Sequence, residues 1–102
     1  MKNPLIFAID LDGVLCDISP SYTNYPVAKP IEQNIRKLKL LYSQGHRIII
    51  YTSRPEIDTE VTKKWLNEHL IPYDELRMGK PRADVYVDDL SVPIKEWRDT
   101  EY

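Results

Sequence analysis

The sequence lacks the features that several protein classes need. Cys16 is the only cysteine, which excludes an internal disulfide framework. No apolar run approaches the roughly 18 residues of a membrane span. Lys2 is soon followed by Pro4, and the apolar run after it ends in acidic residues, unlike a signal peptide. The net charge of −2 gives no basic footprint for nucleic acid. We therefore expect a cytoplasmic protein that binds neither membranes nor nucleic acid.

Internal repeats and low-complexity stretches are also missing. The 102 residues can bury one modest core, so we expect a single domain over residues 1–102. The chain instead alternates apolar runs with helical patterns, which predicts an α/β fold with a parallel sheet. The expected strands cover residues 5–10, 47–52, part of 71–78, and 83–88. The first expected helix begins near Pro30 and ends at Gly45. A second covers residues 57–69, and a last helical turn is expected at 93–97. Residues 14–29 are expected to form a structured loop.

Apolar residues at helical spacing predict the buried faces of the two main helices. For the first helix these are Ile31, Ile35, Leu38, Leu41 and Tyr42. For the second they are Ile57, Val61, Trp65 and Leu66, with Asp58 or Thr59 as its cap.

Two aspartates, Asp10 and Asp12, end the first apolar run. A run of this kind is typical of a strand buried on both faces of a parallel sheet. Ligands of open α/β sheets bind beyond the carboxyl ends of the strands, so both carboxylates would lie at a binding edge. They would repel each other unless a hard cation such as Mg²⁺ lay between them. The alternative is a simple turn, because Asp and Gly favour turns.

Polar residues follow the later strands as well. Thr52 and Ser53 could bind a phosphate oxygen or cap the next helix. Arg54 could reach a substrate or form a salt bridge. Lys80 and Arg82 lie in a segment held by Gly and Pro, where a cation could neutralise phosphate charge or remain solvated.

A second acidic pair, Asp88 and Asp89, closes the last expected strand. Such a pair suits a divalent cation, although an Asx turn would have the same sequence. Four such features, each at a strand end or in a neighbouring loop, are hard to explain as four separate turns.

The order of these features resembles the four motifs of the haloacid dehalogenase (HAD) superfamily, and the resemblance runs from Ile6 to Asp89. Its motifs are Asp10-Leu11-Asp12-Gly13, Thr52-Ser53, Lys80 and Asp88-Asp89. The chain is most similar to short, capless HAD phosphatases, including those of capsule or surface-polysaccharide biosynthesis. The resemblance implies a Rossmann-like three-layer domain without a cap. It also implies Mg²⁺-dependent hydrolysis of a phosphomonoester, such as a sugar phosphate, through an aspartyl-phosphate.

The resemblance further implies roles for the first two motifs. Asp10 would be the nucleophile and a metal ligand. Asp12 would offer its main-chain carbonyl to the metal, and its side chain would act as general acid and then as general base. Thr52 would hold a phosphate oxygen with the help of the Ser53 N–H. Arg54 is expected to contact the substrate.

In the remaining motifs, Lys80 would neutralise the nucleophile and the transferred group. Arg82 is expected to contact the substrate, and it is the alternative to Lys80 in the third motif. Asp88 would bind the metal through its side chain, and Asp89 would do so directly or through water.

Neither interval between motifs has room for a cap domain. We therefore expect a site for a small phosphorylated substrate that is open, or that is covered by the loop at 14–29 or by a neighbouring subunit. Two other classes remain. One is a non-catalytic binding or scaffold domain of the same fold. The other is a phosphoacceptor signalling domain, which is disfavoured because its acidic pair comes first and its lone phosphoacceptor Asp sits on a middle strand.

Overall fold

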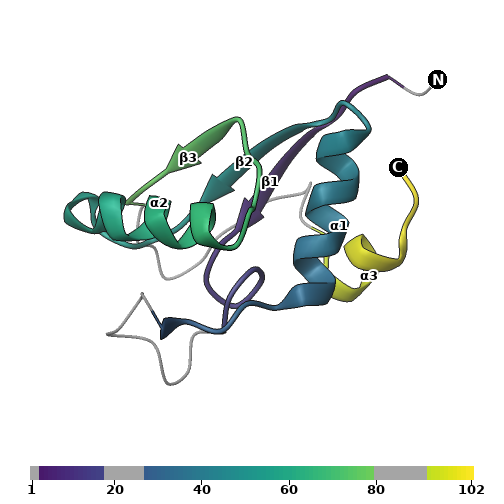
Figure 1. Cartoon of the computed structure of the whole chain (residues 1–102). Coiled ribbons are helices and arrows are strands. Elements are labelled where there is room, and N and C mark those ends of the chain that lie inside the picture. The colour runs from purple at the N-terminus through teal and green to yellow at the C-terminus, as the bar shows by residue number, and fades with distance from the viewer. Residues whose placement is uncertain (1–2, 18–26, 80–91) are drawn as a thin grey trace.

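The computed structural model describes residues 3–17, 27–79 and 92–102 (Figure 1). Lys80, Arg82, Asp88, Asp89 and the expected strand at 83–88 lie outside these residues, as does most of the loop at 14–29. Seven elements follow one another along the described chain. They are β1 (Ile6–Asp10), α1 (Glu32–Ser43), β2 (Arg47–Tyr51), η3 (Glu56–Asp58), α2 (Thr59–Glu68), β3 (Glu75–Arg77) and α3 (Ile94–Asp99).

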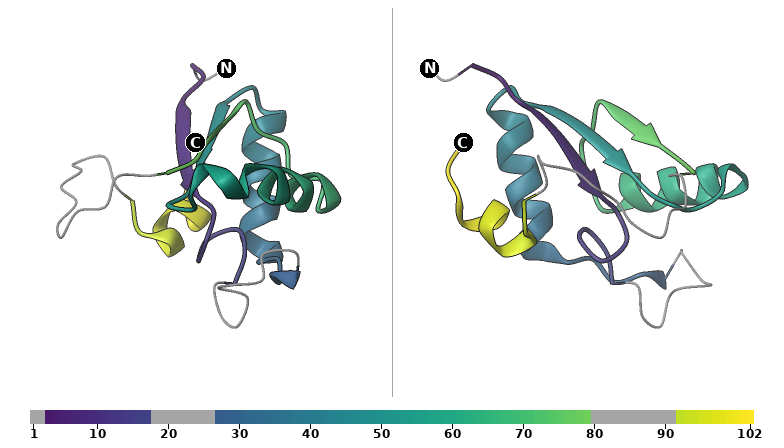
Figure 2. Two further views of the ribbon diagram at one scale, coloured as in Figure 1. Left: turned by 90° about the vertical axis from the view of Figure 1, so that its left-hand side faces the viewer. Right: turned by 180° about the vertical axis from the view of Figure 1, so that it is seen from behind.

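The three described strands form a parallel sheet in the order β1-β2-β3, as the alternation of strands and helices predicts. The register pairs Asp10 with Tyr51, and Tyr51 with Arg77, so the carboxyl ends of all three strands are level. Both α1 and α2 lie on one face of the sheet (Figure 2). The described residues therefore form one helical layer on a sheet. The second helical layer of the predicted three-layer arrangement is not part of them.

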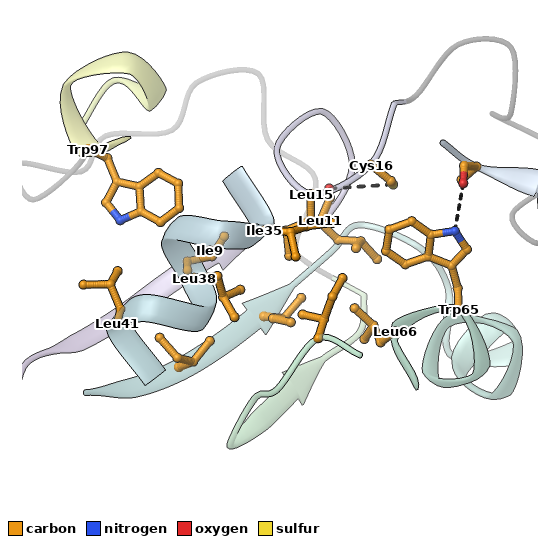
Figure 3. Close-up of a cluster of buried hydrophobic side chains, with 14 residues drawn as sticks. Ile9, Leu11, Leu15, Cys16, Ile35, Leu38, Leu41, Trp65, Leu66 and Trp97 are labelled. Atoms are coloured by element: carbon orange, nitrogen blue, oxygen red, sulfur yellow. Dashed lines mark hydrogen bonds between the residues drawn. The ribbon is translucent and has the colours of Figure 1, made fainter. Parts of the chain in front are cut away.

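The core lies between the sheet and this helical layer. Ile9 of β1 and Ile48 and Ile50 of β2 point toward the helices and are buried. Trp65 of α2 is buried and donates its indole N–H to the carbonyl of Ala28, 2.9 Å away (Figure 3). Trp97 of α3 belongs to the same buried cluster as Leu38 and Leu41 of α1 (Figure 3). Ile9 near the start of the chain and Trp97 near its end therefore belong to one core.

The end of the helix between β1 and β2 lies where the sequence predicts it. The helix α1 ends at Ser43, and Gly45 then adopts a φ of +88° while donating its N–H to the carbonyl of Tyr42. A side chain at this backbone position would be strained, which is why a glycine ends the helix. The predicted last helical turn is also present, as α3 after Pro93.

Three predictions of burial were wrong. Ile57 is 89% exposed because it belongs to the 3₁₀ turn η3 and not to α2, which begins at Thr59. Tyr42 is 41% exposed because it lies in the last turn of α1, where Leu41 takes the inward position. Ile6 is 69% exposed because the described helices cover only the other face of β1, where Ile9 lies. Neither predicted cap of α2 is formed: Asp58 makes no side-chain cap hydrogen bond, and Thr59 is the first residue of the helix, with its hydroxyl donating to the carbonyl of Glu56 at 2.6 Å.

Within the described part of the chain, no helix is both long and apolar enough to cross a membrane.

Candidate functional site

The segments that follow the three strands are held together at one edge of the sheet. The Leu11 N–H donates to the carbonyl of Tyr51 at 3.0 Å, and the Thr52 N–H donates to the carbonyl of Arg77 at 3.1 Å. Beyond them, the Gly79 N–H donates to the carbonyl of Arg54 at 2.9 Å. Strand-like pairing therefore continues past the strand ends and fixes the loop backbones against one another.

The loop after β1 is a tight turn around Leu11. The buried Leu11 offers its carbonyl to the N–H groups of Leu15 at 2.9 Å and Cys16 at 3.2 Å. The Gly13 N–H donates back to the carbonyl of Cys16 at 2.8 Å, and Gly13 has a φ of +88°. This turn brings Cys16 and Asp12 to the same point of the edge.

The Asp12 carboxylate is the centre of the site. Its Oδ1 accepts from Arg54 Nη2 at 2.7 Å and lies 3.5 Å from the Cys16 thiol. Its Oδ2 accepts from the Thr52 hydroxyl at 2.9 Å and from Arg54 Nε at 3.1 Å. Parallel bonds from the Nε and Nη2 atoms of one arginine form a bidentate pair, the geometry that gives such pairs both strength and orientation.

Arg54 is itself enclosed by protein. Only 4% of its side chain is exposed, and its Nη1 donates to the hydroxyl of Thr62 on α2 at 3.0 Å. Its main-chain N–H donates to the Thr52 hydroxyl at 3.1 Å. Of the two roles left open for Arg54 by the sequence, the structure shows the salt bridge. A guanidinium held in this way favours a role in positioning Asp12 over the predicted contact with substrate.

These contacts set the charge at the site. Burial by itself would raise the pKa of Asp12, but the hydrogen bonds and charge of Arg54, with the Thr52 hydroxyl, hold that pKa below its ordinary value. The ionised pair therefore contributes stability above the usual aspartate pKa. That contribution is lost as the pH falls through the lowered value.

Cys16 is protonated in this environment. Burial, and then the negative charge of Asp12, raises the pKa of the Cys16 thiol to about 12. The sulfur is a weak hydrogen-bond donor here and has none of the thiolate character of a nucleophile.

The other predicted residues of the first two motifs lie at the same edge. Asp10 is the last residue of β1 and is half-buried. Thr52 is fully buried, and its hydroxyl is shared between Asp12 and the N–H of Arg54. Ser53, next to it, is exposed. Lys80, Arg82, Asp88 and Asp89, which the sequence predicts for the other two motifs, lie outside the described residues.

The described residues suit a hard metal ion only in part. Among them, no three His, Cys, Asp or Glu side chains gather as a metal site. The Asp12 carboxylate is occupied by Arg54, so the oxygen atoms that this segment could offer a cation include the Asp12 main-chain carbonyl and the Asp10 carboxylate. Oxygen donors of these two kinds are what Mg²⁺ prefers, so the first motif fits that ion.

Two residues that contribute to the site, Cys16 and Thr62, were not predicted from the sequence. Cys16 follows Asp12 by four residues, and its place could only be seen once the loop was known to turn. Thr62 lies on α2, where a threonine in a helix carries no signal of function.

Comparison with known proteins places the fold. A crystal structure of a target protein from Vibrio cholerae matches with a TM-score of 0.80 and 27% identity, covering 94% of this chain and 89% of the other. Two structures of a Pnkp1/Rnl/Hen1 complex, one described as an RNA repair complex, each contain a chain that matches at 26% identity. Their TM-scores are 0.68 and 0.66, over 84% of this chain but only 31% and 28% of those chains. No protein-family model and no curated protein matches the sequence.

These similarities, together with the sheet topology, identify a small Rossmann-like α/β domain. They are compatible with a HAD-like fold.

Proposed function

We propose that this chain is a Mg²⁺-dependent phosphatase that hydrolyses a phosphomonoester through an aspartyl-phosphate on Asp10. The main support is the loop of Asp10 and Asp12, held against Thr52 at the carboxyl edge of a parallel sheet. In that fold class, this edge is where ligands bind. Similarity to chains of an RNA repair complex is compatible with a phosphate-bearing substrate.

The first step is transfer of the phosphoryl group to the protein. A carboxylate oxygen of Asp10 forms a bond to phosphorus while the bond from phosphorus to the leaving oxygen breaks. The small fraction of Asp12 that is protonated, since Arg54 and Thr52 hold its pKa below the ordinary value, gives its proton to that leaving oxygen. The Ser53 N–H holds a phosphoryl oxygen, the Thr52 hydroxyl holds another once its proton turns from Asp12 Oδ2 to the phosphate, and Lys80 or Arg82 offsets their charge.

The second step frees Asp10. Asp12, now ionised, accepts a proton from water as the water oxygen bonds to phosphorus and the bond to Asp10 breaks. Inorganic phosphate leaves and both aspartates are restored. Mg²⁺ would be held by the Asp10 carboxylate, the Asp12 carbonyl and Asp88, with Asp89 directly or through water, and it would reduce the repulsion between carboxylate and phosphate.

A generic aryl phosphate tests the proposal. We expect the purified chain to release inorganic phosphate from it catalytically in Mg²⁺, because a good leaving group makes few demands on substrate recognition. A scaffold domain would give no release, and a phosphoacceptor domain would give a lasting phospho-aspartate without turnover. A panel of phosphorylated metabolites, with sugar phosphates and a phosphorylated oligoribonucleotide, then identifies the substrate class. Sugar phosphates are expected to be turned over faster, since the net charge of −2 does not favour RNA.

Replacement of Asp12 separates the two steps. In Asp12→Ala the nucleophile and the main-chain carbonyl remain, but the acid and the base are lost, and steady turnover should fall by about 10²- to 10⁴-fold. The loss should be smaller for an aryl phosphate than for a sugar phosphate, because the aryl leaving group needs little protonation. Rapid-quench measurement on the aryl phosphate should still show a burst of phosphoenzyme in the variant. If the wild type shows a burst and the variant none, Asp12 is needed for the attack itself.

A further inference from the structure

We propose that Arg54 is a positioning residue that acts on the reaction only through Asp12, by fixing the carboxylate of Asp12 in one orientation at the sheet edge. This inference rests on the proposed phosphatase function, and it assigns Arg54 a different role from the substrate contact expected from the sequence.

The hydrogen bonds that the Asp12 carboxylate accepts leave it little freedom to rotate. An ionised carboxylate has about four lone-pair positions. Around Asp12 two are taken by Arg54, one by the Thr52 hydroxyl, and the Cys16 thiol lies at the fourth, 3.5 Å away. Rotation of the carboxylate would break both bonds to Arg54 together. The orientation of Asp12 is therefore set chiefly by the arginine.

One position remains open to exchange. The Cys16 thiol is the weakest of these donors, and it also lies 3.8 Å from the carbonyl of Leu11, to which its hydrogen can turn. The Asp12 side chain keeps 27% of its surface exposed. Water can therefore reach the Asp12 carboxylate while Arg54 remains bound to it, as a general base requires.

The enclosure of Arg54 also restrains Asp12. Separating a buried guanidinium from a carboxylate to which it makes two hydrogen bonds is costly, so departure of Asp12 is disfavoured. Thr62 fixes the third nitrogen of the same guanidinium from α2, and the Arg54 carbonyl is tied to Gly79. Arg54 is thus held by α2 through its side chain and by the segment after β3 through its carbonyl, independently of Asp12. Among the described residues, the side chain of Arg54 donates hydrogen bonds to Asp12, Thr62 and Cys16.

A double-mutant cycle tests this role. In the wild-type background, Arg54→Gln should lower kcat on an aryl phosphate by about 10²-fold, the cost of misplacing a reacting group by about 1 Å. KM should stay within about twofold, because uniform substrate binding is not affected. In the Asp12→Ala background the same change should lower kcat by less than about twofold, because there is no carboxylate left to position. A further large loss in that background, or a rise in KM with kcat unchanged, would overturn the proposal.

Three further variants keep the result interpretable. Arg36→Gln removes an exposed arginine of α1 and should leave kcat and KM unchanged, which controls for loss of charge. Arg54→Lys keeps the charge but not the bidentate geometry and should restore only part of kcat. Thr62→Val loosens Arg54 without removing it, so it serves if Arg54→Gln fails to fold. It should lower kcat by a smaller factor, and only while Asp12 is present.

A failure of the phosphatase proposal would look different. If the wild type turns over no phosphate ester, the phosphatase function is wrong, but urea unfolding of the same proteins still reports on the pair. Arg54 and Asp12 should then show a coupling in unfolding stability, which strictly additive effects of the two changes would contradict.

Discussion

Asp10→Asn is expected to abolish turnover while leaving the fold intact. The amide has nearly the same shape as the carboxylate but lacks the charge and the nucleophilic oxygen, so no aspartyl-phosphate can form. Asp10 ends β1, where the side chain is half-buried, and its backbone remains paired with β2. Phosphate release should fall to background, and the rapid-quench burst that Asp12→Ala retains should vanish.

The measurement is steady-state hydrolysis of an aryl phosphate, with thermal unfolding to show that the variant is folded. A variant that is folded and keeps more than a few per cent of the wild-type rate would rule out Asp10 as the nucleophile. The contrast with Asp12→Ala matters, because only one residue separates Asp12 from Asp10 at the end of β1, yet the two are assigned to different steps of the reaction.

Removal of the metal should have an effect of similar size. Turnover should stop in excess EDTA and return when Mg²⁺ is restored, since two anions must otherwise approach each other unshielded. Ca²⁺ should inhibit, because its larger and looser coordination shell misplaces the nucleophile. Undiminished hydrolysis in excess chelator would show that the site does not use a metal.

Asp88→Ala tests whether Asp88 is a ligand of that metal. The Mg²⁺ concentration for half-maximal activity should rise by at least about 10-fold, the lower end of the effect of disturbing a metal site. Asp99→Ala is the matched control, because Asp99 is an exposed aspartate of α3 and its loss should leave the Mg²⁺ requirement unchanged. Equal requirements in the two variants would remove Asp88 from the ligand set.

Local patterns in the sequence were sufficient for much of the fold. The apolar runs before Asp10 and Thr52 are the strands β1 and β2, and the helical spacing after Pro30 is α1. These features act within a few residues of the chain. They are the Gly and Pro residues that bound each element, the β-branched runs of the strands and the glycine at the helix end. The prediction of Ile57 as a buried residue failed for the same reason. A periodic pattern shows that a helix exists but does not decide where its first turn begins.

The order of the motifs in the sequence predicts a chemistry, and it brings Asp10, Asp12 and Thr52 to one edge once a parallel sheet is assumed. It left open whether Arg54 meets a substrate or a carboxylate. That choice depends on contacts across a separation of 42 residues, between the loop after β1 and the segment after β2. Only the tertiary structure shows the ion pair with Asp12, because the level register of the strands and the hydrogen bond to Thr62 of α2 bring the guanidinium to Asp12 and bury it there.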